Sequence, residues 1–340
     1  MKPPFRTRSA RLALVLPLAV GAVALAVWRG PDFDVVADAF GSVEWRWVAL
    51  AVGINLASVV VRSVAWKVVV DQAVPPPPPG QRNVFAAFCV GLLANAALPG
   101  RVGELARVVV LTRRVRRFPG AWATVSGTVF AHRLFDVVAS VALVLFVLYA
   151  ARIPEWAKPG LAMVLGVGLG LLLAGLLLAR RQNRSGVHGI GSLRRVLRMA
   201  RWGLTVLKRP APAVAALIFQ LLGWTAQLFA VWAALRAFDI RAPIAAAALV
   251  LVLMNLVNAF PLWPGNVGLV QAAIALSLLS YGVAYGHGFA FGIGLQAIEA
   301  SVGVALGLLF LAREGFSFAM LKRMPEVTDV ELDERVERIA

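Results

Sequence analysis

Residues 95–107 interrupt an apolar segment with a Pro-Gly pair and then carry three charged residues at intervals of three. Because proline lacks a backbone N–H and clashes with the preceding turn, a helix that enters this stretch should end near Leu98. We predict a helix break at Pro99, Gly100 and Gly103, since glycine permits tight turns. Irregular backbone at membrane depth is tolerated only where protein buries it or where it lines a polar cavity. This break therefore marks the candidate functional centre.

Composition decides whether such a break lies in a membrane. The 340 residues are 60% hydrophobic and 15% charged, whereas a soluble domain is roughly half apolar and about a quarter charged. We therefore predict an all-α polytopic membrane protein. The net charge of +17 fits cytoplasmic loops that face anionic lipid, and no folded basic module indicates a nucleic-acid partner. One cysteine and three histidines without ligand spacing predict no disulfide, no metal site and no cofactor.

Six apolar segments have the length of a crossing helix. They are residues 12–28, 45–70, 121–149, 160–178, 211–235 and 289–311. The first segment, within an N-terminal membrane helix 1–28, could instead be a signal peptide, and we favour its retention because the rest of the chain is integral to the membrane. Arginines crowd the loop 179–210, which predicts that this loop, the tail 313–340 and both termini are cytoplasmic at the plasma (inner) membrane.

Two further apolar segments are shorter and broken, at residues 83–112 and 243–280. Residues 83–98 would span only about 24 Å as a helix. The arginines that follow residue 112 belong on the same side as the start of this segment. We therefore predict a re-entrant hairpin there, and a second one at the break formed by Pro264, Gly265 and Gly268.

The two hairpins belong to an internal repeat. Pro99-Gly-Arg-Val-Gly103 aligns with Pro264-Gly-Asn-Val-Gly268, and Arg133-Leu-Phe-Asp136 aligns with Gln296-Ala-Ile-Glu299. Each copy holds two crossings, and one connecting helix lies between the copies, so the second copy should be inverted. The copies and the connecting helix are residues 45–150, 211–312 and 160–178. Inverted repeats whose broken helices meet near the membrane midplane are typical of transporters.

Arg133 and Asp136 lie near the middle of a long apolar segment, roughly 18 Å from its start. A charge at that depth costs several kcal/mol and should face a partner or a cavity. One interpretation is an i,i+3 salt bridge that only holds the helix in register. The other is an anion site in which Asp136 holds Arg133 in place.

Arg101, Glu104 and Arg107 admit the same two interpretations. Their spacing permits an Arg–Glu–Arg triad within one helix. The restarting helix also points its N-terminal amides inward, which suits a phosphate group, so we predict that Arg101, Arg107 and Arg133 bind a lipid phosphate. Arg107 could also lie at the membrane interface.

The second hairpin is less charged. Asn266 stands where the first copy has Arg101, and Gln271 follows it. Glu299 should be protonated, or be partnered by Gln296 or by a basic residue of the other repeat, and its role is either a structural hydrogen bond or proton coupling. We assign supporting or coupling roles to Glu104, Asp136, Glu299, Gln271 and Asn266, and we expect Asn95 and Asn258 to cap the broken ends.

These residues carry a family resemblance. The motifs N-x-x-L-P-G-R-x-G-E-x-x-R, R-x-x-D and P-x-x-P-G-x-x-G resemble the lysylphosphatidylglycerol synthase transmembrane-region family, the flippase half of multiple-peptide-resistance factors. The resemblance covers about residues 12–312. It implies movement of lipids between leaflets, in the best-understood relatives an aminoacylated phosphatidylglycerol. Asn266 and Gln271 depart from the glycine and glutamate common in the family. The sequence has no counterpart of the soluble aminoacyl-transferase domain, so we do not expect synthesis of the lipid.

We therefore expect a transporter rather than an enzyme: a translocase for a phosphate-bearing lipid. The alternatives are a membrane enzyme that acts on a polyprenyl-phosphate substrate, such as a glycosyl transferase with Glu104 as acid or base, and a partner subunit of an envelope-lipid pathway. The expected partners are membrane lipids, together with a lipid synthase or a second copy of the chain.

Overall fold

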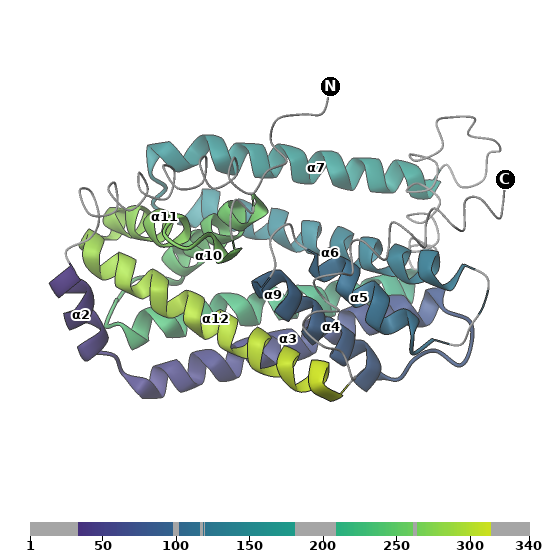
Figure 1. The fold of residues 1–340 in the computed structure, drawn as a ribbon. Helices are drawn as coiled ribbons and strands as arrows, with labels where there is room; N and C mark the ends of the chain where they lie inside the picture. Colours follow the sequence, from purple (N-terminus) through teal and green to yellow (C-terminus); the bar gives the residue numbers. More distant parts are fainter. Residues whose placement is uncertain are drawn as a thin grey trace, which may run out of the picture.

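The computed structural model describes residues 33–97, 102–115, 118, 120–180, 209–260 and 264–313. These residues form α-helices and short 3-10 turns, with no strand among them (Figure 1). The helices are α2 (Phe33–Gly41), α3 (Trp45–Ala73), α4 (Gln81–Ala97), α5 (Gly103–Thr112), α6 (Ala121–Ala150), α7 (Lys158–Arg180), α9 (Pro210–Ala237), α10 (Ile244–Ala259), α11 (Leu269–Leu278) and α12 (Tyr285–Arg313). The 3-10 turns are η2 (Glu155–Ala157), η5 (Pro264–Asn266) and η6 (Leu279–Tyr281). The all-α prediction is confirmed.

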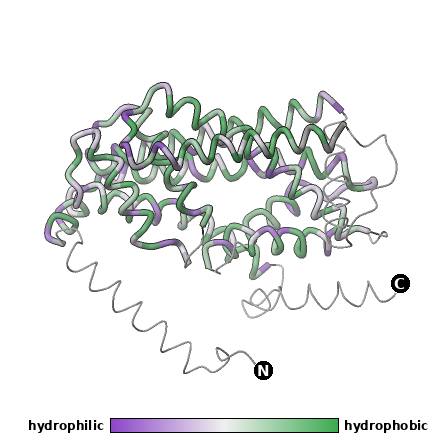
Figure 2. The backbone as a smooth tube through the Cα atoms, turned by 90° about the horizontal axis from the view of Figure 1, so that it is seen from above, coloured by the Kyte–Doolittle hydropathy of each residue, from purple (hydrophilic) through white to green (hydrophobic). Residues whose placement is uncertain are grey.

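Five helical stretches in the described part of the chain are long and apolar enough to cross a membrane. They are α3, α6, Glu155–Ala174 at the start of α7, α9 and α12. They match five of the six predicted crossings, and the sixth, within residues 1–28, lies outside the described residues. Residues 181–208 and 314–340, which make up most of the basic loop and the tail, also lie outside them. Figure 2 shows hydrophobic residues along most of each helix, with hydrophilic positions in the interior as well as at the ends.

The helices follow one another as two similar series. In the first series α3, α4, α5 and α6 have 29, 17, 10 and 30 residues, and in the second α9, α10, α11 and α12 have 28, 16, 10 and 29. Their packing is paired too. The helix α12 packs against the short helices α4 and α11, and α6 packs against α10 and α5. Figure 1 places α4 and α5 in one half of the bundle and α10 and α11 in the other. These observations support the predicted inverted repeat.

Helices α3 and α9 pack together along their length and run antiparallel. The rings of Trp47 and Trp232 lie 5.8 Å apart, so the start of α3 meets the end of α9. At the other end, the Arg209 guanidinium of α9 donates to Gln72 Oε1 at 3.1 Å. Between these contacts the Ser58 hydroxyl donates to the Gly223 carbonyl oxygen at 2.8 Å. Ser58 and Gly223 are 165 residues apart, which is also the separation of Pro99 and Pro264.

The two predicted helix breaks lie at helix ends. Ordinarily the first backbone N–H groups of a helix lack partners. At the start of α5 the Gly103 N–H donates to Asn95 Oδ1 at 2.8 Å, which confirms the capping role of Asn95. Pro99 and Gly100 lie outside the described residues. A Cβ atom on Gly103 would lie 2.2 Å from the Gly91 carbonyl oxygen, so only glycine allows α4 and α5 to approach this closely.

The second break uses left-handed backbone. Gly265, Asn266 and Gly268 have φ values of 69°, 44° and 90°, in the region that favours glycine and asparagine. The Asn266 side-chain amide donates to the carbonyl oxygens of Val257 and Phe260 at 3.0 and 3.1 Å, and the Gly268 N–H donates to Gln271 Oε1 at 2.6 Å. Asn266 and Gln271 therefore close the ends of α10 and α11, after the turn that Pro264 begins.

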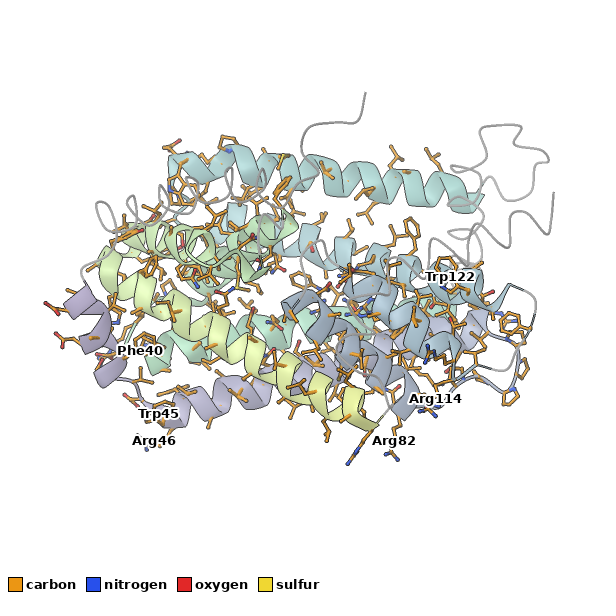
Figure 3. The ribbon with its side chains drawn as sticks, viewed as in Figure 1. Phe40, Trp45, Arg46, Arg82, Arg114 and Trp122 are labelled. Carbon is orange, nitrogen blue, oxygen red and sulfur yellow. The ribbon has the colours of Figure 1, made fainter. Side chains whose placement is uncertain are left out.

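Aromatic and arginine side chains lie at both ends of the bundle (Figure 3). Phe40, Trp45 and Arg46 lie at one end, and Arg82, Arg114 and Trp122 lie at the other (Figure 3). Trp45 is 75% exposed. Tryptophan is enriched at membrane interfaces. Trp45 at one end and the arginine at position 114 at the other therefore occupy places that suit the two membrane interfaces (Figure 3).

Two apolar cores leave a polar zone between them. The first core includes Trp66, Phe88 and Leu111, and the second includes Phe238, Ile274 and Phe291. Along α9 the polar residues lie between Ala216 of the first core and Val231 of the second. Along α12 the polar residue Glu299 likewise separates Ile298 of the second core from Val302 of the first. The long helices thus bring their polar side chains to one level of the bundle.

Candidate functional site

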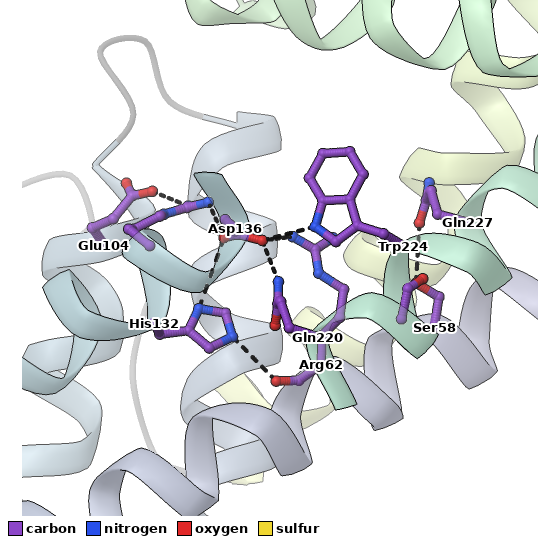
Figure 4. Close-up of polar contacts among 10 residues, drawn as sticks. Ser58, Arg62, Glu104, His132, Asp136, Gln220, Trp224 and Gln227 are labelled. Atoms are coloured by element: carbon purple, nitrogen blue, oxygen red, sulfur yellow. Dashed lines mark hydrogen bonds and ion pairs between the residues drawn. The ribbon is translucent and has the colours of Figure 1, made fainter. Parts of the chain in front are cut away.

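Asp136 on α6 is the centre of a buried polar cluster (Figure 4). Its carboxylate accepts hydrogen bonds from Arg133 Nη1 at 3.0 Å, Arg62 Nη2 at 3.1 Å and Trp224 Nε1 at 3.0 Å, and also from the side-chain amide of Gln220. The side chain of Asp136 is only 8% exposed. A carboxylate so far from water needs these donors, because an unpaired buried charge is costly. We call Arg62, Glu104, Arg133, Asp136, Gln220 and Trp224 the Asp136 cluster.

Arg133 connects the first hairpin to the crossing helix. Its guanidinium contacts Asp136 on its own helix and also Glu104 on α5. The predicted i,i+3 pair of Arg133 and Asp136 is therefore present. The Arg133 side chain is 39% exposed, whereas its partner Asp136 is almost covered. A guanidinium has five N–H donors, so Arg133 keeps donors for a further acceptor.

In the described residues Glu104 reaches across to another helix rather than to Arg107 of its own helix. Glu104 forms its ion pair with Arg133 of α6, and it forms none with Arg107 among the described residues. The Arg107 guanidinium instead lies against the rings of Phe88 and Trp66. Arg101 lies outside the described residues.

Arg107 is buried rather than exposed at a membrane interface. Its side chain is 3% exposed. Its guanidinium carbon lies 3.9 Å from the ring centroid of Phe88 and 5.9 Å from that of Trp66. Stacking on aromatic rings stabilises a guanidinium by about 1–2 kcal/mol where water is excluded. In this conformation Arg107 presents no open surface to a lipid headgroup.

The second half of the chain holds an amide counterpart of the cluster. Gln227 on α9 donates to Glu299 Oε1 at 2.7 Å, and Gln271 on α11 donates to Gln296 Oε1 at 2.5 Å. Gln296 also donates to the carbonyl oxygen of Gly265. Gln296 does not donate to Glu299: it faces the hairpin, and Gln227 reaches Glu299 from α9 instead. We call Gln227, Gln271, Gln296 and Glu299 the Glu299 set.

The two groups have the same pattern of connections with different chemistry. Arg62 joins α3 to α6 through Asp136, and Gln227 joins α9 to α12 through Glu299. Arg133 joins α6 to the first hairpin, and Gln296 joins α12 to the second. The first half of the chain thus uses ion pairs where the second half uses amides, so the ion pairs gather around α6 and the amide contacts around α12.

Sequence reasoning missed four of these residues: Arg62, Gln220, Trp224 and Gln227. Arg62 was visible as a charge inside the apolar segment 45–70, where any ionisable residue is a functional candidate. Gln227 follows Arg62 by 165 residues, the same separation as the two Pro-Gly pairs, so the repeat could have pointed to it.

His132 completes the packing beneath Asp136. It is 1% exposed, and its ring Nε2 lies 3.2 Å from the Arg62 carbonyl oxygen while Nδ1 lies 3.8 Å from Asp136 Oδ2. It also contacts the ring of Phe88 edge-on. Among the described residues, no group of three His, Cys, Asp or Glu side chains is placed to hold a metal ion.

The fold and this site define a polytopic helical membrane protein in which two broken hairpins meet crossing helices through intramembrane ion pairs and amides. The chain belongs to the family described as Lysylphosphatidylglycerol synthase TM region, whose model matches residues 12–307. This match confirms the resemblance drawn from the motifs. No curated protein and no solved structure matches the chain.

Proposed function

We propose that this protein is a lipid translocase that moves a phosphate-bearing lipid between the leaflets of the plasma membrane and that it is not an enzyme. An aminoacylated phosphatidylglycerol or another envelope lipid is the proposed cargo. Membership in a family of flippase-like membrane regions supports the proposal. The observation that carries it is the Arg133 side chain, which is 39% exposed and lies between the first hairpin and α6.

Arg133 is the residue that we propose contacts the phosphate first. A phosphate oxygen can take the place of the Glu104 carboxylate against the guanidinium, because both are anionic acceptors of suitable geometry. The exchange keeps the charge of Arg133 compensated, which limits the desolvation cost. Arg101 stays a predicted contact, and Arg107 would need to leave its ring partners to join.

Binding would then act on the hairpin. In the described part of the chain, the pair formed by Glu104 and Arg133 is the only ion pair between α5 and α6. A lipid that displaces Glu104 from Arg133 removes this connection and favours separation of α5 from α6. Asp136 and Arg62 keep Arg133 on its helix throughout. A ligand shifts a conformational equilibrium by its differential affinity for the two states, and this exchange supplies such a difference.

The orientation that we propose has both termini in the cytoplasm. The arginines at 82 and 114 lie at one end of the bundle, and this end would face the cytoplasm (Figure 3). Partners beyond membrane lipids, such as a lipid synthase or a second copy of the chain, stay predictions.

A liposome assay tests the translocase. The purified protein is reconstituted with a headgroup-labelled anionic phospholipid, and the labelled fraction accessible to a membrane-impermeant quencher is followed with time. We expect the wild-type protein to raise the rate and Arg133→Ala to lower it by about tenfold, the effect of losing ~1.4 kcal/mol. Arg241→Ala is the matched control, because Arg241 is 81% exposed and pairs only with Asp239. Equal rates for wild type and Arg133→Ala would refute the proposal.

The enzyme alternative needs Glu104 as an acid or base. Its carboxylate is engaged with the Arg133 guanidinium in this conformation. No observation favours this alternative over transport. Formation of a glycosylated lipid from a lipid-phosphate sugar, lost in Glu104→Gln, would reverse this preference.

A further inference from the structure

A pocket of about 140 Å³ lies between α6, α7, α9 and α10, outside the Asp136 cluster except for one shared residue. Most of its lining is aliphatic, with Val252 and Leu256 on α10. Three lining side chains can form hydrogen bonds: Ser140, Trp224 and Asn255. An apolar cavity of roughly 150 Å³ holds a benzene-sized molecule. The pocket therefore has room for a short piece of hydrocarbon chain.

Trp224 is the shared residue and forms a common wall. Its indole N–H donates to Asp136 Oδ1 at 3.0 Å, and the Arg62 guanidinium carbon lies 5.4 Å from its ring centroid. On α6, Ser140 follows Asp136 by one turn, about 6 Å along the axis. The glycerol backbone of a phospholipid separates its phosphate from its acyl esters by a comparable distance. A lipid with its phosphate at the cluster would thus place its esters at the pocket.

The polar side chains of the pocket suit ester groups. The Asn255 side-chain amide donates to the Leu251 carbonyl oxygen at 2.7 Å, which leaves its second N–H as a donor. The Ser140 hydroxyl has no hydrogen-bond partner among the described residues. At membrane depth no bulk water satisfies such groups. The carbonyl oxygens of acyl esters are acceptors that fit both donors.

The equivalent place in the other half of the bundle is closed. Ser140 and Val144 correspond to Gly303 and Gly307 of α12, 163 residues later, the separation of Arg133 and Gln296. A Cβ atom on Gly307 would lie 2.4 Å from Leu93 Cβ and 2.9 Å from the Cys89 carbonyl oxygen. The helix α12 thus packs directly on α4, whereas α6 and α10 leave a pocket. If the two halves packed alike, the place between α6 and α10 would be closed as well.

We propose that this pocket binds the ester end and first methylene groups of one acyl chain of a phospholipid whose phosphate lies at Arg133. The inference rests on the proposed function and adds the position of the lipid tail. The remainder of the chain lies in the bilayer, between helices that already face lipid. Trp224 separates headgroup from tail and contacts both.

Photolabelling of the full-length protein tests this placement. The probe is a phosphatidylglycerol with a diazirine on the acyl carbon next to the ester, and labelled peptides are identified by mass spectrometry. We expect labelling at residues 252–259 and 140–144 above that of the exposed face of α7. Val252→Trp fills the pocket and should lower this labelling about tenfold, equivalent to ~1.4 kcal/mol. Val167→Trp, at a position 58% exposed on α7, is the matched control and should leave it unchanged.

A second variant guards against misfolding. Asn255→Leu keeps the volume of the side chain and removes its hydrogen bonds, so it should reduce labelling while the thermal unfolding midpoint stays unchanged. Diacylglycerol with the same diazirine should label the pocket weakly, because it lacks the phosphate that Arg133 binds.

Two results would overturn the inference. One is labelling spread evenly over the lipid-facing helices, and the other is diacylglycerol labelling as strong as that of the phospholipid. Lipid transport without pocket labelling would refute only the proposed acyl-chain site. Pocket labelling without transport would refute only the proposed translocase function.

Discussion

Arg133 and Gln296 make the same connection in the two halves of the bundle: each joins a long helix to the broken hairpin packed beside it. Arg133 does so through the carboxylate of Glu104, and Gln296 through the amide of Gln271 and the carbonyl oxygen of Gly265. A competing anion can displace a carboxylate from a partly exposed guanidinium, whereas a neutral amide pair attracts an anion far less. The two hairpins should therefore differ in how they respond to an anionic lipid.

Removal of Asp136 should destabilise the protein more than any other single change in the cluster. Asp136→Ala leaves Arg62 and Arg133 without their shared counter-charge, which should cost ~3 kcal/mol or more of the free energy of unfolding. Thermal unfolding in detergent, followed by intrinsic fluorescence, measures the shift. Glu155→Ala removes a carboxylate that is 88% exposed and should change stability by less than about 1 kcal/mol. Equal midpoints for the two variants would contradict the central role of Asp136.

Glu104 and Arg133 should show energetic coupling. A double-mutant cycle of Glu104→Gln, Arg133→Gln and both together isolates their interaction, and we expect about 1 kcal/mol because both side chains are partly exposed. The same cycle for Glu104 and Arg107 should give a value near zero, since these two form no ion pair among the described residues. A larger coupling energy for the second pair would mean that Glu104 and Arg107 interact within α5, as in the triad.

Glu299→Gln should be tolerated where Asp136→Asn is not. The partner of Glu299 is the neutral amide of Gln227, so a glutamine of the same shape keeps one hydrogen bond and strands no charge. Asp136→Asn removes the negative charge that compensates the positive charges of two arginines. Unfolding midpoints of both variants, measured side by side, should fall far more for Asp136→Asn. The opposite order would mean that Glu299 has a charged partner.

The contact between α12 and α4 should reject any side chain at Gly307. Gly307→Val would push a side chain into Leu93 and the Cys89 carbonyl oxygen, which should cost about 1–3 kcal/mol of stability. Gly170→Val is the matched control, because a Cβ atom there meets nothing within 4 Å. If both variants unfold at the same temperature, the helices are further apart than described.

Cysteine labelling checks the orientation. The single native cysteine, Cys89, is fully buried, so it gives little background. Trp45→Cys should react with a membrane-impermeant maleimide added to intact cells with a permeabilised outer envelope. Arg82→Cys should react only after the plasma membrane is opened. The reverse pattern would invert the topology.

The positions of the helices could be predicted from the sequence, but the contacts between them could not. Apolar length located the crossing helices, and Pro264 with its neighbours marked the second break, because these signals are local. The pairing of Arg62 with Asp136 spans 74 residues and depends on the rotation of α3 about its axis. A helix that is apolar on all sides has no polar face, so its sequence does not show how the helix is rotated about its axis. For the same reason spacing along one helix could not reveal that Glu104 pairs with Arg133 of α6.

The contact of Ser58 with Gly223 joins segments that correspond to each other in the predicted repeat. Two separate half-length chains, inserted in opposite orientations across the bilayer, would need such a surface in order to pair. Each chain would bind the same segment of the other, running in the opposite direction. The antiparallel α3–α9 contact therefore has, within a single chain, the geometry that a symmetric dimer interface would have. Across this contact the two segments differ in chemistry, because the first carries Arg62 where the second carries Gln227.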